Sequence, residues 1–171
     1  MFQIGQVVSY GTTGICTIED IRQEAVSRSG VKKQEYYVLR PAAAPTCTTY
    51  VPTGSAALTA KIRPVMSKEQ IDAMIDAVDE ETLPWIEDPR RRAESYQQVL
   101  VGGISSRLLK LIACLYLEKQ SRGKQGKKFC ASDEKILSGA ERMVNEEFSY
   151  ALQIPPKQVA PYIAQRLGAQ S

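Results

Sequence analysis

The spacing of the apolar residues changes near residue 67, and this change limits the folds that the chain can adopt. Before it, four or five short segments have the alternation and the β-branched or aromatic content of strands, with turn residues between them. These segments are residues 6–10, 15–21, 34–39, 46–52 and 62–65, and residues 27–30 interrupt the pattern after the second. Short strands with tight turns predict a small SH3- or Tudor-like β-barrel over residues 1–66.

Residues 67–171 instead have the spacing of helices. Ser67 and Gln70 have the form of a capping box, and apolar residues at 71, 74, 75 and 78 then form one stripe. Further helices are expected from Asp88-Pro89 to about residue 101, from Ser105 or Ser106, from Ser132 to 152, and over 161–167. The sequence therefore predicts an α+β protein, with the barrel followed by an all-α bundle of four or five helices over residues 67–171.

Several kinds of chemistry are excluded or disfavoured by the composition. Histidine is absent, so the chain holds no Ser-His-Asp triad, Cys-His pair or His-bearing zinc site. The cysteines Cys16, Cys47, Cys114 and Cys130 are far apart and are expected to be buried or partly buried thiols. No secretory signal or membrane-spanning stretch is present in this sequence. We expect a cytoplasmic protein that is not an enzyme and needs no cofactor, metal or small-molecule substrate.

Charge is distributed unevenly along the chain. The formal net charge is +3 overall, but residues 67–88 carry −7 and residues 89–135 carry +7. A cationic block beside an acidic one indicates that the middle of the chain meets a polyanion.

Trp85, the only tryptophan, precedes three arginines that begin the cationic block. A tryptophan in a loop is often a core anchor, but an apolar ring beside cations is also how some proteins prise open DNA at a base step. Arg90, Arg91 and Arg92 cannot all face one surface of a helix, and at least one is expected to reach phosphate.

The densest basic run lies further along, in a segment expected to be a loop with two glycines. Such a loop can contact phosphates without reading sequence, although a plain soluble loop has the same composition. The candidate DNA-binding residues of this run are Lys119, Arg122, Lys124, Lys127 and Lys128.

A strand near residue 50 offers a different kind of interface. If it lies at the edge of its sheet, its free backbone groups can pair with a strand of another protein; as an internal hairpin strand it cannot. Its residues are Thr48, Thr49, Tyr50, Val51 and Pro52.

These features, in this order, resemble the CarD-like (CdnL) family of bacterial transcription regulators over nearly the whole chain. Residues 4–21 resemble the first hairpin of that family, 36–39 and 50–52 its later strands, and 62–67 its domain junction. Trp85 with Arg92, followed by residues 140–152, resembles its helical half.

The resemblance implies a Tudor-like N-terminal domain that pairs a strand with the RNA polymerase β subunit. It also implies a helical domain on promoter double-stranded DNA at the upstream edge of the bubble, where the tryptophan inserts into the minor groove. Such a protein would be associated with the bacterial nucleoid through the polymerase. The chain departs from the family in having Tyr50 where better-known members have an arginine, and in the acidic residues Glu87 and Asp88 after the tryptophan.

The sequence thus predicts a transcription regulator that stabilises the open complex by binding both polymerase and DNA. Two other classes remain open at this stage: a protein–protein adaptor without DNA binding, and an RNA-binding barrel module. The salt dependence of DNA binding distinguishes the adaptor from the regulator. An RNA-binding barrel would be expected to expose aromatic side chains among basic residues.

Overall fold

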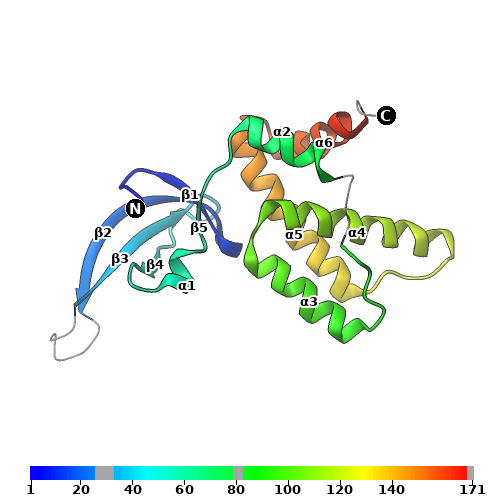
Figure 1. The fold of residues 1–171 in the computed structure, drawn as a ribbon, viewed down its shortest axis with the longest axis horizontal. Coiled ribbons are helices and arrows are strands. Elements are labelled where there is room, and N and C mark those ends of the chain that lie inside the picture. The colour runs from blue at the N-terminus through cyan, green and yellow to red at the C-terminus, as the bar shows by residue number, and fades with distance from the viewer. Residues whose placement is uncertain (26–32, 79–82, 169–171) are drawn as a thin grey trace. The chain divides into compact units, whose positions relative to one another are not determined.

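The structure is a computed structural model, and it describes residues 1–25, 33–78 and 83–168. The chain divides into two compact units, Met1–Val65 and Met66–Ser171, each of which is described by itself (Figure 1). The turn predicted at residues 27–30 lies outside the described residues.

The N-terminal unit is a five-stranded antiparallel sheet. Its elements are β1 (Val7–Tyr10), the 3₁₀ turn η1 (Gly11–Thr13), β2 (Gly14–Ala25), β3 (Lys33–Pro41), β4 (Thr49–Pro52), the short helix α1 (Ala56–Thr59) and β5 (Ile62–Pro64). The strand order is β4-β3-β2-β1-β5, so β4 and β5 are the edges of the sheet. Together with the helical unit below, this sheet confirms the predicted α+β class.

Alternation of side chains across the sheet builds one apolar cluster in this unit. On β3 and β4, Tyr37 lies opposite Val51 and Leu39 lies opposite Thr49. Tyr37, Leu39 and Val51 are all buried in the cluster, together with Val8 and Cys16. The neighbouring position, Tyr50, points to the other face and is half exposed. A register shift between Ile18 and Asp20 bends β2 within this arrangement.

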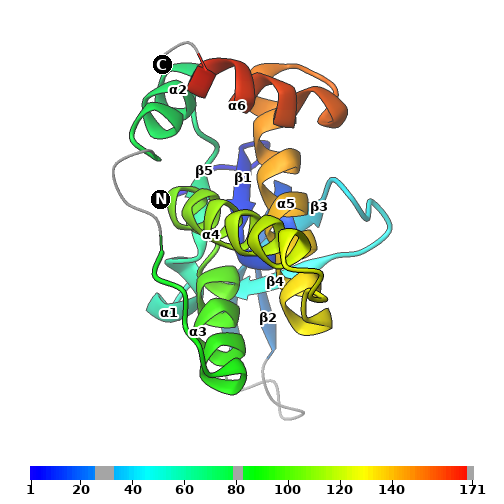
Figure 2. The ribbon, with the colours of Figure 1, turned by 90° about the vertical axis from the view of Figure 1, so that its right-hand side faces the viewer.

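The C-terminal unit is helical. Its elements are α2 (Lys68–Asp76), α3 (Pro89–Gly102), α4 (Ser105–Lys124), α5 (Ala131–Leu152), the 3₁₀ turn η3 (Pro156–Gln158) and α6 (Val159–Gly168). Figures 1 and 2 show α4 crossing α5, with α3 beside them and with α2 and α6 side by side at one end of α5. Among the described residues this unit has five α-helices, which agrees with the predicted four or five. None of the described helices is both long enough and apolar enough to cross a membrane.

Helix α4 buries one face in the helical core. Leu108, Leu111 and Leu115 on α4 pack in one buried cluster with Ile71 of α2 and Phe148 of α5. The sequence predicted a central position for α4, because its apolar residues cover too much surface for a single buried stripe. Instead α5 packs against α2, α3, α4 and α6, and two of the apolar residues of α4, Tyr116 and Leu117, are exposed.

Of the five predicted helix starts, those of α2 and α3 are correct and those of α4, α5 and α6 are displaced; α6 begins at Val159 rather than at about residue 161. The Ser67 hydroxyl accepts a hydrogen bond from the Gln70 backbone N–H, and the Gln70 side-chain oxygen accepts one from the Ser67 backbone N–H, which completes the capping box of α2. Asp88 caps α3, with Pro89 as the first helical residue. The N-cap of α4 is Ile104 rather than Ser105 or Ser106, and that of α5 is Cys130 rather than Ser132; neither has a side-chain cap.

The cysteines correct another expectation. Cys16 and Cys114 are buried, as predicted, but Cys47 and Cys130 are exposed, and all four are free thiols. Cys47 precedes an edge strand and Cys130 precedes α5, so neither is covered by a neighbouring element.

Candidate nucleic-acid and polymerase interfaces

Trp85 lies in the segment that leads into α3, and its indole ring is half-buried rather than enclosed. The Arg92 guanidinium lies over the ring, with its central carbon 4.1 Å from the ring centroid. The Arg122 guanidinium lies 5.6 Å from the same centroid. Two cations therefore contact the ring by cation–π interactions, which hold it on the surface of the helical core.

A groove of about 340 Å³ opens beside this ring. It lies between the Trp85 segment and α4, and it is lined by Leu83, Pro84, Trp85, Cys114, Leu117, Glu118 and Ser121. Leu117 is 60% exposed, so the indole lies beside a second apolar side chain that solvent reaches. Leu117 is not among the residues predicted from the sequence, because nothing in the linear pattern of α4 indicates that it lies next to a tryptophan 32 residues away.

Arg92 is not available to DNA, and this part of the prediction is corrected. The residue is 3% exposed. Its guanidinium makes a forked ion pair with the Asp133 carboxylate, with Nη2 2.8 Å from Oδ2 and Nε 3.0 Å from Oδ1. The hydrogen bond to Asp133 raises the pKa of Arg92 further above its usual value. Arg92 therefore links α3 to α5 inside the helical unit.

Tyr96 provides a second attachment for the Trp85 segment. Its hydroxyl donates to the Pro84 carbonyl at 2.9 Å, and its ring packs at a tilt against Trp85 with the centroids 6.5 Å apart. Burial and the contact with the Cys114 thiol raise the pKa of Tyr96. The phenol is therefore neutral at ordinary pH and remains a hydrogen-bond donor to this segment.

The remaining cations of α3 lie at its exposed first turn. Arg90 and Arg91 are both exposed, and Arg90 has only a loose ion pair with Glu94, at 3.7 Å. A partner of this kind, between two exposed side chains, is worth little energetically and is readily exchanged for phosphate.

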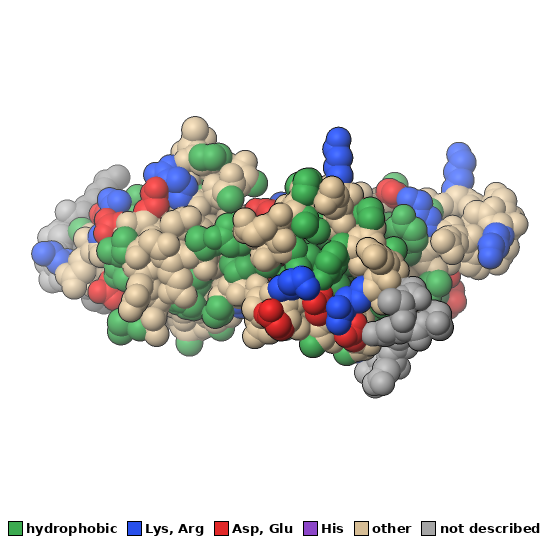
Figure 3. Space-filling view, turned by 90° about the horizontal axis from the view of Figure 1, so that it is seen from above, with side chains coloured by type: hydrophobic (Ala, Val, Ile, Leu, Met, Phe, Trp, Pro, Cys, Tyr) green, Lys and Arg blue, Asp and Glu red, His purple; other side chains and the backbone are tan. Residues whose placement is uncertain are grey.

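The basic run that was expected to be a loop lies partly in α4. Arg122 and Lys124 occupy the last turn of α4, where the helix dipole favours cations, and the loop begins only at Gln125. Lys119 and Arg122 are paired with Glu134 and Glu118, at 2.8 and 2.7 Å. Lys124, Lys127 and Lys128 are exposed, and within the described parts of the chain no carboxylate pairs with them. Figure 3 shows lysine and arginine side chains standing out where α4 ends.

In the N-terminal unit, β4 is an edge strand of the sheet rather than an internal hairpin strand, which is the alternative that leaves it free to pair with another protein. It pairs only with β3, and the Thr53 N–H donates to the Glu35 carbonyl at 2.9 Å just beyond the paired residues. Hydrogen-bonded and non-hydrogen-bonded pairs alternate along an antiparallel ladder, so Val51 and Thr49 bond to β3 and Tyr50 does not.

The backbone N–H and C=O of Tyr50 therefore point away from the sheet, where an added strand would lie. Pro52, the next such position, has no N–H, and its carbonyl accepts from Ser55. Val51 is fully buried and its backbone faces β3, so this predicted contact residue cannot meet a partner directly. Thr48 is exposed just before the strand.

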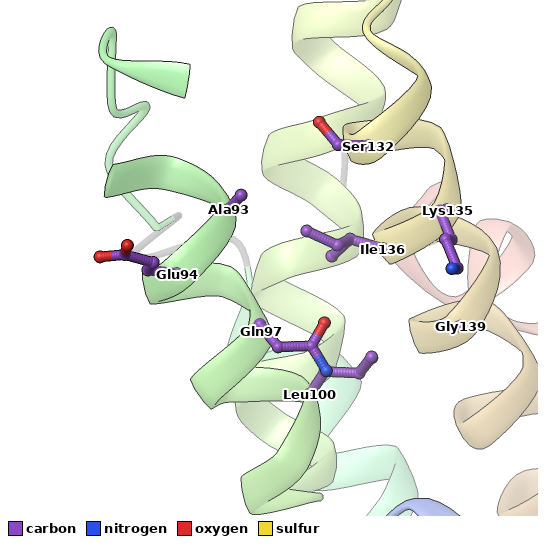
Figure 4. Close-up of a pocket in the computed structure, with 8 residues that line it drawn as sticks. All are labelled: Ala93, Glu94, Gln97, Leu100, Ser132, Lys135, Ile136 and Gly139. Carbon is purple, nitrogen blue, oxygen red and sulfur yellow. The ribbon is translucent and has the colours of Figure 1, made fainter. Parts of the chain in front are cut away.

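A different groove, of about 610 Å³, lies between α3 and α5 (Figure 4). Ala93, Leu100 and Ile136 form its apolar floor, while Glu94 and Lys135 lie at its rim. A Cβ at Gly139 would lie 3.3 Å from Leu100, so the glycine allows the two helices to approach here. The groove holds none of the predicted site residues, and we assign it no role.

Comparison with known proteins identifies the N-terminal unit. Residues 2–66 match the family model of the CarD-like/TRCF RID domain. No curated protein matches the chain. The matched residues include the whole five-stranded sheet and its β4 edge. The chain carries a CarD-like/TRCF RID domain over residues 2–66, and it is an RNA polymerase-interacting, transcription-associated protein.

Proposed function

We propose that this protein regulates transcription by binding the RNA polymerase β subunit through β4 and promoter DNA through its helical unit, so that the open complex lasts longer. The observation that carries the proposal is the free β4 edge, with the Tyr50 N–H and C=O pointing outward, inside the matched domain. No catalytic step is part of the proposal, because a ligand that binds the melted promoter better than the closed one shifts their ratio by that difference.

The geometry of β4 supports docking by strand addition. An added strand would exchange two backbone hydrogen bonds with Tyr50, and further pairing would stop at Pro52. The Tyr50 side chain is 48% exposed and packs edge-on against Tyr36, with ring centroids 6.3 Å apart. This aromatic pair would lie beside the added strand, in the place where better-known family members offer an arginine.

The helical unit supplies the DNA-binding part of the proposal, which we call its DNA limb. Trp85 presents a half-buried ring that is not enclosed, with the exposed Leu117 next to it. Apolar side chains at a base step, combined with cations on the flanking phosphates, are a known way to hold a distorted duplex. The exposed cations that could serve this purpose are Arg90, Arg91, Lys124, Lys127 and Lys128.

The energy required is modest. A tenfold longer open-complex lifetime corresponds to about 1.4 kcal/mol. One inserted aromatic ring and a few phosphate contacts are sufficient for a difference of this size.

Replacement of Trp85 by alanine tests the DNA limb. With the cognate polymerase, the lifetime of the open complex is expected to fall to about a tenth, a change of about 1.4 kcal/mol. The affinity for the polymerase β subunit should stay level, because Trp85 is not in the matched domain. An unchanged lifetime would assign Trp85 to the core alone and would remove the DNA limb.

The adaptor without DNA binding remains the second candidate, and one observation favours it. Arg92, which the sequence placed on the DNA surface, is buried, and Lys119 and Arg122 have carboxylate partners. An adaptor would bind polymerase normally but would show no salt-dependent affinity for DNA. The RNA-binding barrel is not carried forward: Arg22 beside Tyr50 is itself paired with Asp20 and Glu24, so the aromatic face has no free cation among the described residues there.

A further inference from the structure

Arg92 connects three parts of the helical unit through one buried side chain. It originates on α3 and forms its forked ion pair with Asp133 on α5. Its Nη1 donates to the backbone carbonyls of Ile86 and Glu87, at 2.8 and 3.1 Å. These two residues directly follow Trp85, so Arg92 fixes the backbone at the base of the indole.

The same guanidinium also contacts the indole itself. Its central carbon lies 4.1 Å from the Trp85 ring centroid, the closest approach of any cation to a ring among the described residues. One planar group therefore fixes both the main chain that carries Trp85 and the plane of its ring. Asp133, which is 1% exposed, fixes the orientation of the Arg92 guanidinium through the forked ion pair.

Stability alone does not account for this arrangement. A buried ion pair can often be replaced by apolar residues of similar volume without loss of stability, since burying both charges offsets much of their attraction. Apolar side chains would fill the same space between α3 and α5. They could not donate hydrogen bonds to the Ile86 and Glu87 carbonyls, and they could not make the cation–π contact that orients the ring.

We propose that Arg92 and Asp133 are positioning residues that hold the Trp85 indole ready for insertion into melted promoter DNA. This inference rests on the proposed function, because the indole has to be held ready only if it inserts into DNA. It goes beyond that function in assigning the readiness of the ring to an ion pair that never touches DNA. Because the ring is already ordered, binding would not have to immobilise it, and part of the entropic cost of association is avoided.

The test uses the single tryptophan as its own probe. In the full-length Asp133→Asn variant, Arg92 still lies near the ring but loses its charged partner. We expect the acrylamide quenching constant of Trp85 fluorescence to rise about twofold and its anisotropy to fall, because local loosening exposes the ring. The open-complex lifetime should shorten by a smaller factor than in Trp85→Ala. Arg166→Gln is the control: it breaks the α2–α6 ion pair with Asp76 and should change neither measurement.

A second variant keeps the proposal testable if Asp133→Asn fails to fold. The double variant Arg92→Met with Asp133→Leu replaces the pair by apolar residues, and it should fold with unchanged circular dichroism but increased quenching of Trp85. If the quenching and anisotropy of the folded variants equal those of the wild type, the positioning role is wrong.

The outcomes also separate this inference from the proposed function. If Trp85→Ala shortens the open-complex lifetime but Asp133→Asn changes neither the lifetime nor the quenching, only the positioning inference fails. If the quenching rises in Asp133→Asn but Trp85→Ala leaves the lifetime unchanged, the ion pair orders the ring, but the proposed function fails and the ring is not ordered for DNA.

Discussion

The hydrogen bond between Asp72 and Tyr162 is expected to make part of the stability of the helical unit depend on pH. The Tyr162 hydroxyl donates to the Asp72 carboxylate at 2.5 Å, and this hydrogen bond is the main reason that the pKa of Asp72 is lowered, with Lys68 and Arg166 adding to it. A carboxyl whose pKa is lowered by folding contributes stability above its ordinary pKa and loses it as the pH falls through the folded value. We therefore expect Tyr162→Phe to lower the free energy of unfolding at pH 7 by about 1 kcal/mol, measured by urea denaturation.

The pH profile separates the hydrogen bond from simple packing. Below the folded-state pKa of Asp72 the wild type has lost this contribution too, so the stability difference between Tyr162→Phe and wild type should shrink on acidification. Tyr150→Phe is a suitable control, because its side chain is 43% exposed on α5. A difference that stays constant down to pH 2 would contradict the assignment.

At the level of single residues, the sequence could show that Arg90, Arg91 and Arg92 diverge around a helix, but not which of them points inward. That choice depends on Asp133, 41 positions away in the chain, which provides the buried partner. The exposure of Trp85 could not be predicted from the sequence for the same reason. The sequence shows that cations follow Trp85, but it does not show that one of them, Arg92, is buried in the core.

Among the helices, the start of α3 offers a direct test of capping. The Asp88 carboxylate accepts a hydrogen bond from the Arg91 N–H at 2.7 Å, and its charge also complements the positive end of the helix dipole. Asp88→Ala is expected to lower the free energy of unfolding by about 1 kcal/mol, measured by thermal or urea denaturation. Ser106→Ala is the matched control: Ser106 lies inside α4 and is not its cap, so the change should be small. Equal losses in both variants would contradict the capping role.

The β4 edge is best tested at Tyr50, where the backbone faces outward. Tyr50→Pro removes the outward N–H without removing a hydrogen bond to β3, so the sheet should persist while a partner strand loses a donor. Affinity for the polymerase β subunit is expected to fall by about tenfold, or 1.4 kcal/mol, measured by titration calorimetry. Tyr50→Phe, which keeps the N–H and the ring, should bind nearly as well as wild type. Normal binding by the Tyr50→Pro variant would exclude strand addition at this edge.

The elements themselves were largely predictable, for reasons that differ along the chain. Strong periodicity located the strands and helices, a capping box marked the start of α2, and Asp88 with Pro89 marked the start of α3. The starts of α4 and α5 were misplaced because several serines could have served as caps and none does. The segment from Arg122 was expected to be a loop because Gly123 lowers helix propensity, but α4 continues through this glycine to Lys124. The edge position of β4 depends on sheet order, which periodicity does not contain.

At the scale of the whole molecule, charge is arranged locally rather than in bulk. Residues 67–171 carry a net charge of zero, because the acidic residues of 67–88 balance the cations of 89–135. Part of that acidic charge is consumed within the unit: Asp76 pairs with Arg166 at 2.6 Å, and Asp72 lies near both Lys68 and Arg166. The DNA binding that we propose would therefore have to come from exposed cations and not from net charge; we call Arg90, Arg91, Lys124, Lys127 and Lys128 the cation cluster.

Salt dependence measures that cluster directly. If Arg90, Arg91, Lys124, Lys127 and Lys128 each neutralise one phosphate, the logarithm of the DNA association constant should fall with the logarithm of the salt concentration with a slope of about −4 to −5. The double variant Lys127→Ala with Lys128→Ala should reduce the magnitude of the slope by about 2, because each lost contact releases about one counterion fewer. Lys157→Ala removes an exposed cation from η3, outside the cluster, and should leave the slope unchanged. A slope near zero for the wild type would favour the adaptor, since a protein that meets only polymerase has no condensed counterions to release.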